Sequence, residues 1–192
     1  SKAAGSREAL ALPPDIAAGM VSAASRVLED LTSSGKEEPS HVVLRLFVHA
    51  LPLAGAELAR PSGAACQRLA WLARRTHSLR TCSLAMQGLS GVADLAPALV
   101  EACAEDSVEA VLAAARCLNT ALLHGPAPTL GMLRDAGNLL SALLPLLTLV
   151  KGHLEPSSLV FLASLQPCAV IGAPYVVRSQ HVARSSPLAG VA

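Results

Sequence analysis

The chain has 192 residues and a formal net charge of +1, and this length suggests one domain, or one domain with tails. So small a net charge excludes attraction to nucleic acid or lipid headgroups through a global electrostatic field. Hydrophobic residues make up 52% of the chain and aromatic residues 2%. Because the strong helix formers Ala and Leu dominate and β-branched residues are sparse, we expect an all-α fold.

The first predicted unit, 1–39, consists of an N-terminal arm, a helix and a linker. Apolar residues recur with a period close to 3.6 over 16–31, directly after a Pro-Pro pair, which predicts an amphipathic helix. The polar segment TSSGKEEP at 32–39 is the clearest break in composition and is expected to be a linker. Because the chain opens with Ser1 and not with Met, we expect a processed product or a fragment.

The next helices are predicted to begin at Ser40 and at Ser62. The stretch that follows, 78–106, is expected to form two short amphipathic helices, with Gly88 and Gly91 in the turn between them. A hairpin of this size cannot bury its apolar side alone, so we expect it to stack on neighbouring units.

Further helices are predicted over 107–123, 129–136, 138–150 and 156–165, and the remaining segment, 166–192, is expected to be an irregular tail. The starts of successive hairpins lie 37, 30 and 31 residues apart, a spacing typical of two-helix solenoid repeats. The sequence therefore predicts an α-solenoid of stacked two-helix hairpins over 40–165. The hairpin starts are Ser40, His77, Ser107 and Asn138.

Two of these units, SLAMQGLSGVADLAPALVEACAED and EAVLAAARCLNTALLHGPAPTLGMLRDAG, resemble the helical repeats of organellar proteins. They are similar to the pentatricopeptide and octotricopeptide families and to the related repeats that accompany RAP domains. The shared pattern is Leu and Ala at helical spacing, a Gly turn, and a Leu-rich second helix with an acidic start. The resemblance implies an α-solenoid in a mitochondrion or plastid. Members of these families usually bind RNA, and some are protein-binding subunits of mitoribosomes, respiratory complexes or ATP synthase.

Charge is distributed unevenly along the chain. Residues 41–84 contain six arginines and one acidic residue, whereas residues 85–115 contain five acidic residues and no Lys or Arg. Two interpretations are open: adjacent hairpins neutralise each other, or an Arg-rich face binds an acidic partner. Guanidinium groups at a turn between helices can bind carboxylates or phosphates. The candidate partner-binding residues are Arg68, Arg74, Arg75 and Arg80.

The five cysteines do not form a disulfide framework, because their number is odd and no C-x-x-C pair is present. Each lies among Ala and Leu, where a free thiol behaves as a small hydrophobic side chain. We therefore expect a reducing compartment, and together with the resemblance this favours the mitochondrion. The cysteines are Cys66, Cys82, Cys103, Cys117 and Cys168.

The sequence lacks the motifs of common catalytic and cofactor sites. The Gly-Lys pair at 35–36 lacks the upstream glycine spacing of a phosphate loop, and the segment GLSG at 88–91 has the wrong spacing for a nucleophile elbow. His41 and His49 are eight residues apart on one predicted helix, too far to share a metal ion without a further ligand. We predict no catalytic, cofactor or metal site, and a protein that is not an enzyme.

Two uncharged segments raise the question of a membrane span, which needs roughly 20 apolar residues. The segment 156–177 is long enough, but Gln166 and two internal prolines would leave backbone groups without partners in hydrocarbon. The segment 136–150 is short and contains Asn138 and Pro145. We therefore expect buried scaffold helices and no direct membrane span.

The sequence favours a non-catalytic scaffold subunit that binds other proteins within a larger mitochondrial complex, with ATP synthase, a respiratory complex or the mitoribosome as the host. Two alternatives stay open: an RNA-binding repeat protein that uses the Arg-rich face, and a membrane-associated subunit that uses 156–177. RNA binding normally requires aromatic side chains near the arginines for base stacking. Trp71 is the only candidate, and its apolar sequence neighbours favour a core position.

Overall fold

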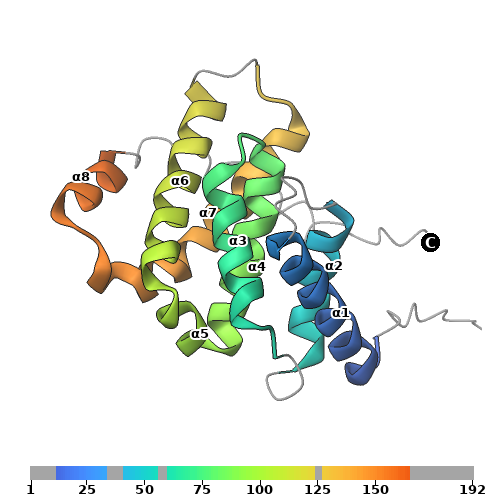
Figure 1. The fold of residues 1–192 in the computed structure, drawn as a ribbon. Coiled ribbons are helices and arrows are strands. Elements are labelled where there is room, and N and C mark those ends of the chain that lie inside the picture. Colours follow the sequence, from blue (N-terminus) through green and yellow to red (C-terminus); the bar gives the residue numbers. More distant parts are fainter. Residues whose placement is uncertain (1–11, 34–40, 56–59, 124–126, 165–192) are drawn as a thin grey trace, which may run out of the picture.

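The structure is a computed structural model that describes residues 12–33, 41–55, 60–123 and 127–164. Over these residues all secondary structure is helical (Figure 1), which confirms the predicted all-α class. The predicted arm, most of the linker, and the tail with Cys168 lie outside the described residues. The helices are α1 (Pro14–Ser33), α2 (His41–Ala54), α3 (Gly63–Arg75), α4 (Leu79–Leu95), α5 (Pro97–Ala102), α6 (Ala104–Leu123), α7 (Leu130–Val150), the short 3-10 helix η1 (Lys151–His153) and α8 (Pro156–Ser164).

Three helices begin at a hydroxyl residue that accepts a hydrogen bond from the backbone N–H three residues later. Ser62 caps α3 at 3.1 Å, Ser78 caps α4 at 3.3 Å, and Thr129 caps α7 at 3.3 Å. These contacts satisfy amide donors that the first helical turn leaves without partners. Directly after α2, Gly55 has a φ of 72°, a left-handed conformation that ends helices and favours glycine. The predicted helix starts at these three residues are confirmed.

The predicted turn at Gly88 and Gly91 is wrong, because both glycines lie inside the continuous helix α4. A Cβ atom on Gly91 would lie 2.9 Å from Cδ2 of Leu51 in α2, and one on Gly88 would lie 3.2 Å from Cδ1 of Leu69 in α3. The missing side chains let these two helices approach α4 closely. Glycine here serves helix packing and not chain reversal.

Two other predicted divisions are also wrong. The second of the two helices expected within 78–106 is divided among the end of α4, the short helix α5 and the beginning of α6. The separate helices expected over 129–136 and 138–150 form one helix, α7. The buried side of α7 runs from Ala136 to Val150 without a break at Asn138, so packing across the predicted boundary favours one continuous helix.

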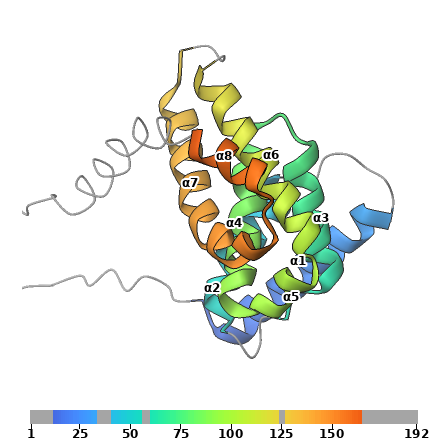
Figure 2. The same cartoon turned by 90° about the vertical axis from the view of Figure 1, so that its left-hand side faces the viewer.

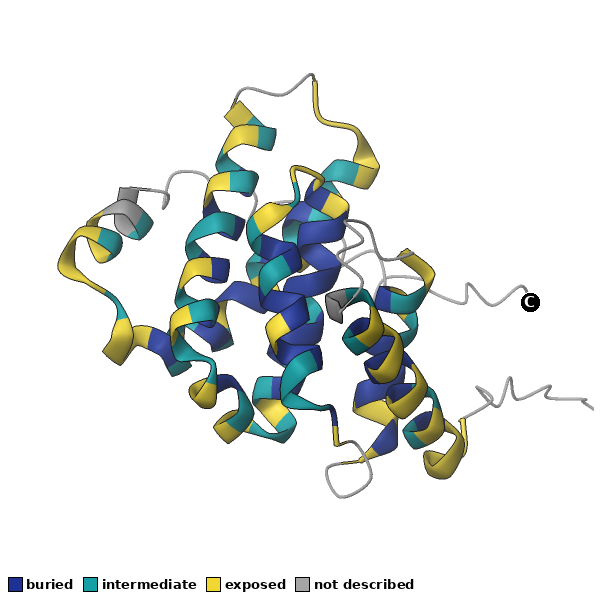
Figure 3. Ribbon diagram, in the orientation of Figure 1, coloured by how far each residue is buried: buried dark blue, intermediate teal, exposed yellow. Residues whose placement is uncertain are grey.

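α1 packs beside α2 and α3 beside α4, while α7 packs most extensively against α4 and also contacts α6. α3 also contacts α1 and α6, while α4 also contacts α2 and α7, so two rows of helices lie against each other (Figures 1 and 2). The helix α4 lies in the middle and is buried along most of its length (Figure 3). At the end of the molecule away from α1 and α2, α8 packs against α6.

The helix within the predicted unit 1–39 is part of the same core. Ala17, Val21 and Leu28 of α1 are fully or almost fully buried and join the central hydrophobic cluster. At the start of the next helix, Nε2 of His41 lies 2.8 Å from Oγ1 of Thr81 in α4, in a hydrogen bond between the two elements. α2 packs mainly with α1 and α4, and α3 packs with α4, α6 and α1, which differs from the predicted hairpin of the helices that begin at Ser40 and Ser62.

Within the described residues, one helical stretch is long and apolar enough to cross a membrane by length and composition, Leu130–His153, and 33% of its most apolar window is buried inside the fold. It comprises α7 and η1. Of the predicted apolar segment 156–177, α8 covers the beginning, and the part after residue 164 lies outside the described residues.

Candidate functional site

A groove of about 610 Å³ lies beside the three residues that connect α3 to α4. This connection forms one wall, and α6 and the start of α7 form the others. The side chains that line it are of two kinds. The cationic ones are Arg74, Arg80 and Arg116, with His77 beside them, and the apolar ones include Leu79, Ala121 and Met132. The groove therefore offers both positive charge and an apolar surface.

A second hollow of about 490 Å³ lies on the other side of the same connection. Trp71 and Arg75 line it, together with the 76–78 segment that both hollows share. The guanidinium carbon of Arg68 lies 4.1 Å from the centre of the Trp71 ring, and that of Arg75 lies 5.8 Å from it. Both distances are within the range of cation–π attraction. The indole therefore serves as a packing surface for two arginines.

Arg74 joins the end of α3 to the beginning of α6. One of its terminal nitrogens lies 2.9 Å from Oδ1 of Asp106, and the other donates to Oε2 of Glu109. The Arg74 side chain is 27% exposed, so solvent screens this ion pair only in part. For Arg74, these contacts support the interpretation that the positive and negative charges of adjacent helices neutralise each other.

The four predicted partner-binding arginines have different surroundings. Arg68 is only 2% exposed, and its guanidinium lies over an indole ring. Arg74 and Arg80 line the groove, whereas Arg75 lines the second hollow. The structure thus brings Arg74 and Arg80 together at the groove.

Arg116 is a groove residue that the sequence reasoning missed. It lies on α6, on the helix predicted over 107–123, and is exposed. Its sequence neighbours are mostly apolar, and it is 36 positions from Arg80. Helical periodicity places it on the solvent side of its own helix, but only the packing of α6 beside the α3–α4 connection brings it to the groove.

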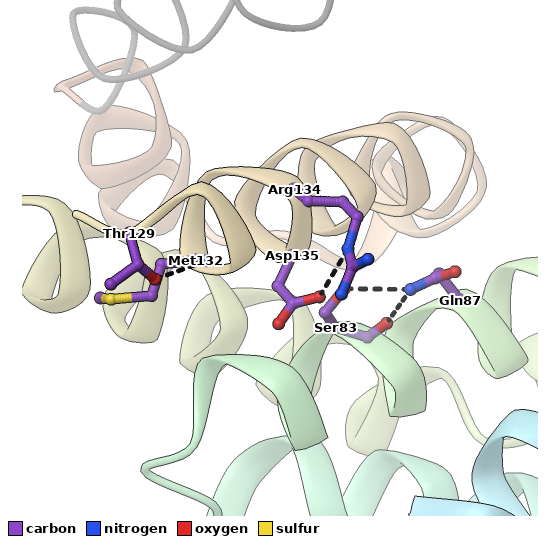
Figure 4. A network of polar contacts seen from close by, with 6 residues as sticks. All are labelled: Ser83, Gln87, Thr129, Met132, Arg134 and Asp135. Atoms are coloured by element: carbon purple, nitrogen blue, oxygen red, sulfur yellow. Dashed lines mark hydrogen bonds and ion pairs between the residues drawn. The ribbon is translucent and has the colours of Figure 1, made fainter. Parts of the chain in front are cut away.

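The start of α7 supplies the acidic residue of the groove, Asp135. Its Oδ1 lies 3.9 Å from Nε of Arg134, a weak ion pair between neighbours in sequence. Figure 4 shows both side chains directed toward the part of α4 that carries Ser83 and Gln87, where the Gln87 amide donates to the carbonyl and hydroxyl oxygens of Ser83 at 3.1 and 3.0 Å. Of these four residues, Asp135 alone lines the groove.

Two thiols meet behind the groove. Cys117 on α6 lines the groove and is half-buried, while Cys82 on α4 is fully buried. The neighbouring Cys82 thiol lowers the pKa of Cys117, whereas Cys117 and burial both raise the pKa of Cys82. Cys117 is therefore the thiol of this pair that ionises first.

A second pair of cysteines lies elsewhere in the fold. Burial raises the pKa of Cys66 to about 12, and the nearby Cys103 raises it as well. Cys66 is fully buried, and Cys103 follows α5, outside the residues that line the groove. The Cys66 thiol stays protonated at neutral pH and behaves as the small apolar side chain that the sequence suggested.

Among the described residues, no group of three or more His, Cys, Asp or Glu side chains lies in an arrangement that could hold a metal ion. The ring of His41 is engaged with Thr81, as described above. No protein-family model matches the chain, and the curated proteins and the solved structures contain no match to it.

Proposed function

We propose that this protein is a non-catalytic, protein-binding subunit whose groove takes an acidic segment of a partner. The observation that supports this proposal is the composition of the groove wall. Arg80 and Arg116 come from different helices and line one groove with apolar side chains, and Asp135 is the single acidic residue among its lining. Carboxylates would pair with the arginines while neighbouring apolar side chains cover the floor.

The arrangement of the helices supports a finer proposal for the fold. Three pairs of helices, α1 with α2, α3 with α4 and α6 with α7, lie in two rows, and each pair contacts the next, as expected for a short α-solenoid in which a unit buries its apolar side against its neighbours. We propose that these pairs form such a stack, with α5 as an irregular insertion. Proteins of this class present surfaces to other macromolecules, which agrees with a binding role.

The resemblance to organellar repeats supports a mitochondrial host complex, with ATP synthase, a respiratory complex or the mitoribosome as candidates. Base stacking requires an accessible aromatic ring near the arginines. Trp71 is half-buried beside the guanidinium groups of Arg68 and Arg75, and it is not among the residues that line the groove. An acidic protein segment is therefore favoured over RNA.

A binding titration tests the proposed function. The probe is a fluorescent peptide of alternating Glu and Leu, and its control replaces every Glu by Gln. We expect the acidic peptide to bind the full chain and its affinity to fall as salt rises, because screening weakens the ion pairs. The double variant Arg80→Glu with Arg116→Glu should weaken binding on the order of tenfold or more.

The matched control is Arg26→Glu with Arg45→Glu, which makes the same total charge change on two exposed residues of α1 and α2, outside the groove. It should leave the affinity for the acidic peptide close to that of the unchanged chain. If the control and the double variant lost the same affinity for the acidic peptide, the net charge of the chain would explain the effect. That result would contradict a binding site in the groove. Tighter binding of oligouridine than of the acidic peptide, lost in the double variant, would establish the RNA alternative instead.

A further inference from the structure

The second hollow differs from the groove in the charge of its lining. Every polar side chain that lines it can donate a hydrogen bond, and none carries a negative charge. The groove, in contrast, has Asp135 among its lining residues. Such a set of donors favours an anion over a cation. The polar residues that line the second hollow are Trp71, Arg75, Thr76, His77, Ser78 and Thr81.

Arg75 supplies this hollow with a positive charge. Its sequence neighbour Arg74 pairs with Asp106 and Glu109, whereas Arg75 forms no ion pair with any described residue. Arg75 is exposed, and its guanidinium carbon lies 5.8 Å from the centre of the Trp71 ring. A guanidinium group beside an aromatic ring keeps N–H donors at its edge for an oxyanion. Arg75 is therefore the cation of the hollow that a ligand can use.

Two hydroxyl groups of the α3–α4 connection add further donors. Oγ1 of Thr76 accepts a hydrogen bond from the backbone N–H of Ser78 at 3.1 Å, and Oγ of Ser78 accepts one from the backbone N–H of Thr81 at 3.3 Å. A hydroxyl group that accepts in this way still has its own O–H to donate. Neither O–H donates to another residue in the part of the chain that the structure describes. Both are therefore available to a ligand.

A phosphate monoester matches this set of donors better than a carboxylate does. A phosphorylated serine has a charge of about −1.5 to −2 at neutral pH and three strong acceptor oxygens, whereas a carboxylate has a single charge and two oxygens. The guanidinium group of Arg75 can bind two phosphate oxygens in a forked contact. The hydroxyl groups of Thr76 and Ser78 can donate to the same phosphate group.

We propose that the second hollow binds a phosphorylated serine or threonine on the same partner segment whose acidic residues occupy the groove. Residues 76–78 line both the groove and the second hollow, so one extended segment can cross this connection and reach both. This inference rests on the proposed function and adds regulation to it. The groove binds carboxylates, and the second hollow distinguishes the phosphorylated partner from the unphosphorylated one.

RNA also carries phosphate groups, but it fits the second hollow less well. Each internal phosphodiester has a single negative charge, and binding of single strands depends on stacking of bases on aromatic rings. Trp71 is half-buried, with the guanidinium groups of Arg68 and Arg75 beside its ring. A phosphorylated protein segment is therefore favoured over RNA.

The test uses two phosphopeptides. They extend the Glu–Leu peptide by a short Gly–Ser linker and one phosphoserine, at the amino end in one peptide and at the carboxyl end in the other. Each is compared with its unphosphorylated form and with a form that has Glu in place of phosphoserine. We expect phosphorylation of one of the two to tighten binding to the full chain on the order of tenfold at low salt. The Glu form should recover only a small part of this gain.

Four variants separate the second hollow from the groove. Arg75→Gln should remove most of the gain from phosphorylation and leave the affinity for the unphosphorylated peptide nearly unchanged. Thr76→Val, which removes the hydroxyl group, should bring the affinities of the phosphoserine and Glu forms closer together. Arg80→Gln in the groove should weaken both peptide forms by a similar factor. The matched control Arg26→Gln, outside the groove and the second hollow, should change neither. Circular dichroism verifies that each variant retains its helices.

Failure of this inference is distinguishable from failure of the proposed function. If the acidic peptide binds but phosphorylation at either end changes nothing, the second hollow is not a phosphate site and the groove proposal stands. The same conclusion follows if Arg26→Gln lowers the gain as much as Arg75→Gln does. If none of the peptides binds, both proposals fail.

Two further results would assign the second hollow to another ligand. Binding of free O-phosphoserine as tight as that of the phosphopeptide would assign it to small phosphate esters. Tighter binding of oligouridine than of either phosphopeptide, lost in Arg75→Gln, would assign it to RNA. Either result would overturn the phosphorylated partner segment as its occupant.

Discussion

Arginines at neighbouring positions of this chain meet different physical environments. Arg68 is buried over an indole ring, while Arg74 bridges α3 to α6 through two carboxylates. Arg80 lies exposed at the groove. Guanidinium groups adapt to all these settings because they combine a planar face for stacking with donors for carboxylates. Residue type alone therefore does not distinguish a structural arginine from one available to a partner.

The bridge formed by Arg74 can be measured as a coupling energy. We expect a double-mutant cycle of Arg74→Ala with Asp106→Ala to give about 0.5–1 kcal/mol at low salt, and less at high salt, because the pair is partly exposed. Urea unfolding followed by circular dichroism provides the four free energies of unfolding. The cycle of Arg75→Ala with Asp106→Ala is the control and should give a coupling near zero. Equal coupling in both cycles would contradict a specific bridge.

At the scale of single helices, α4 shows how packing overrides local sequence signals. Gly88 and Gly91 are typical turn residues, yet both lie in the middle of this helix. They are tolerated because Leu51 and Leu69 occupy the space that their side chains would take. The cost of glycine in a helix, about 1 kcal/mol relative to Ala, is offset by close contact with two other helices.

Replacing these glycines should therefore have the opposite effect from the usual one. We expect Gly88→Ala with Gly91→Ala to lower the free energy of unfolding by about 1–3 kcal/mol, because the added methyl groups overpack the core. The matched control is Gly19→Ala in α1, where a Cβ would meet nothing within 4 Å, and it should raise stability by up to about 1 kcal/mol. Urea unfolding measures both. Stabilisation by the double replacement would show that the helices have room to separate.

At the scale of the whole molecule, the protection of backbone amides from hydrogen exchange should depend on how many neighbours each helix has. The central helix α4 contacts α2, α3, α6 and α7, whereas α8 contacts mainly α6. Elements at the end of a stack have fewer neighbours and open at a lower free energy than central ones. The stability of the fold is therefore expected to be greatest in the middle and lowest at its ends.

Native-state hydrogen exchange with mass spectrometry tests this order. We expect amides of α4 to exchange slowest, and those of α8 to exchange at least about a hundredfold faster, because they open without global unfolding. The helix α1, which packs on both α2 and α3, should fall between them. Equal protection of α8 and α4 would indicate that all helices unfold as one cooperative unit.

The sequence by itself determined the helical class and several helix boundaries. Ala and Leu content sets helix propensity, and Ser62, Ser78 and Thr129 cap their helices through contacts three residues away, so these features are local and readable. The uneven charge along the chain also indicated the contact that Arg74 makes with the acidic start of α6.

Only the tertiary structure decided which helices pair, why two glycines stay inside α4, and which arginines share a groove with Arg116 and Cys117. The same is true of the neighbouring thiols of Cys82 and Cys117, 35 residues apart in the chain. The physical reason is that a helical period predicts which side of a helix is buried, but not which neighbour buries it. That choice depends on side-chain shapes contributed by distant segments.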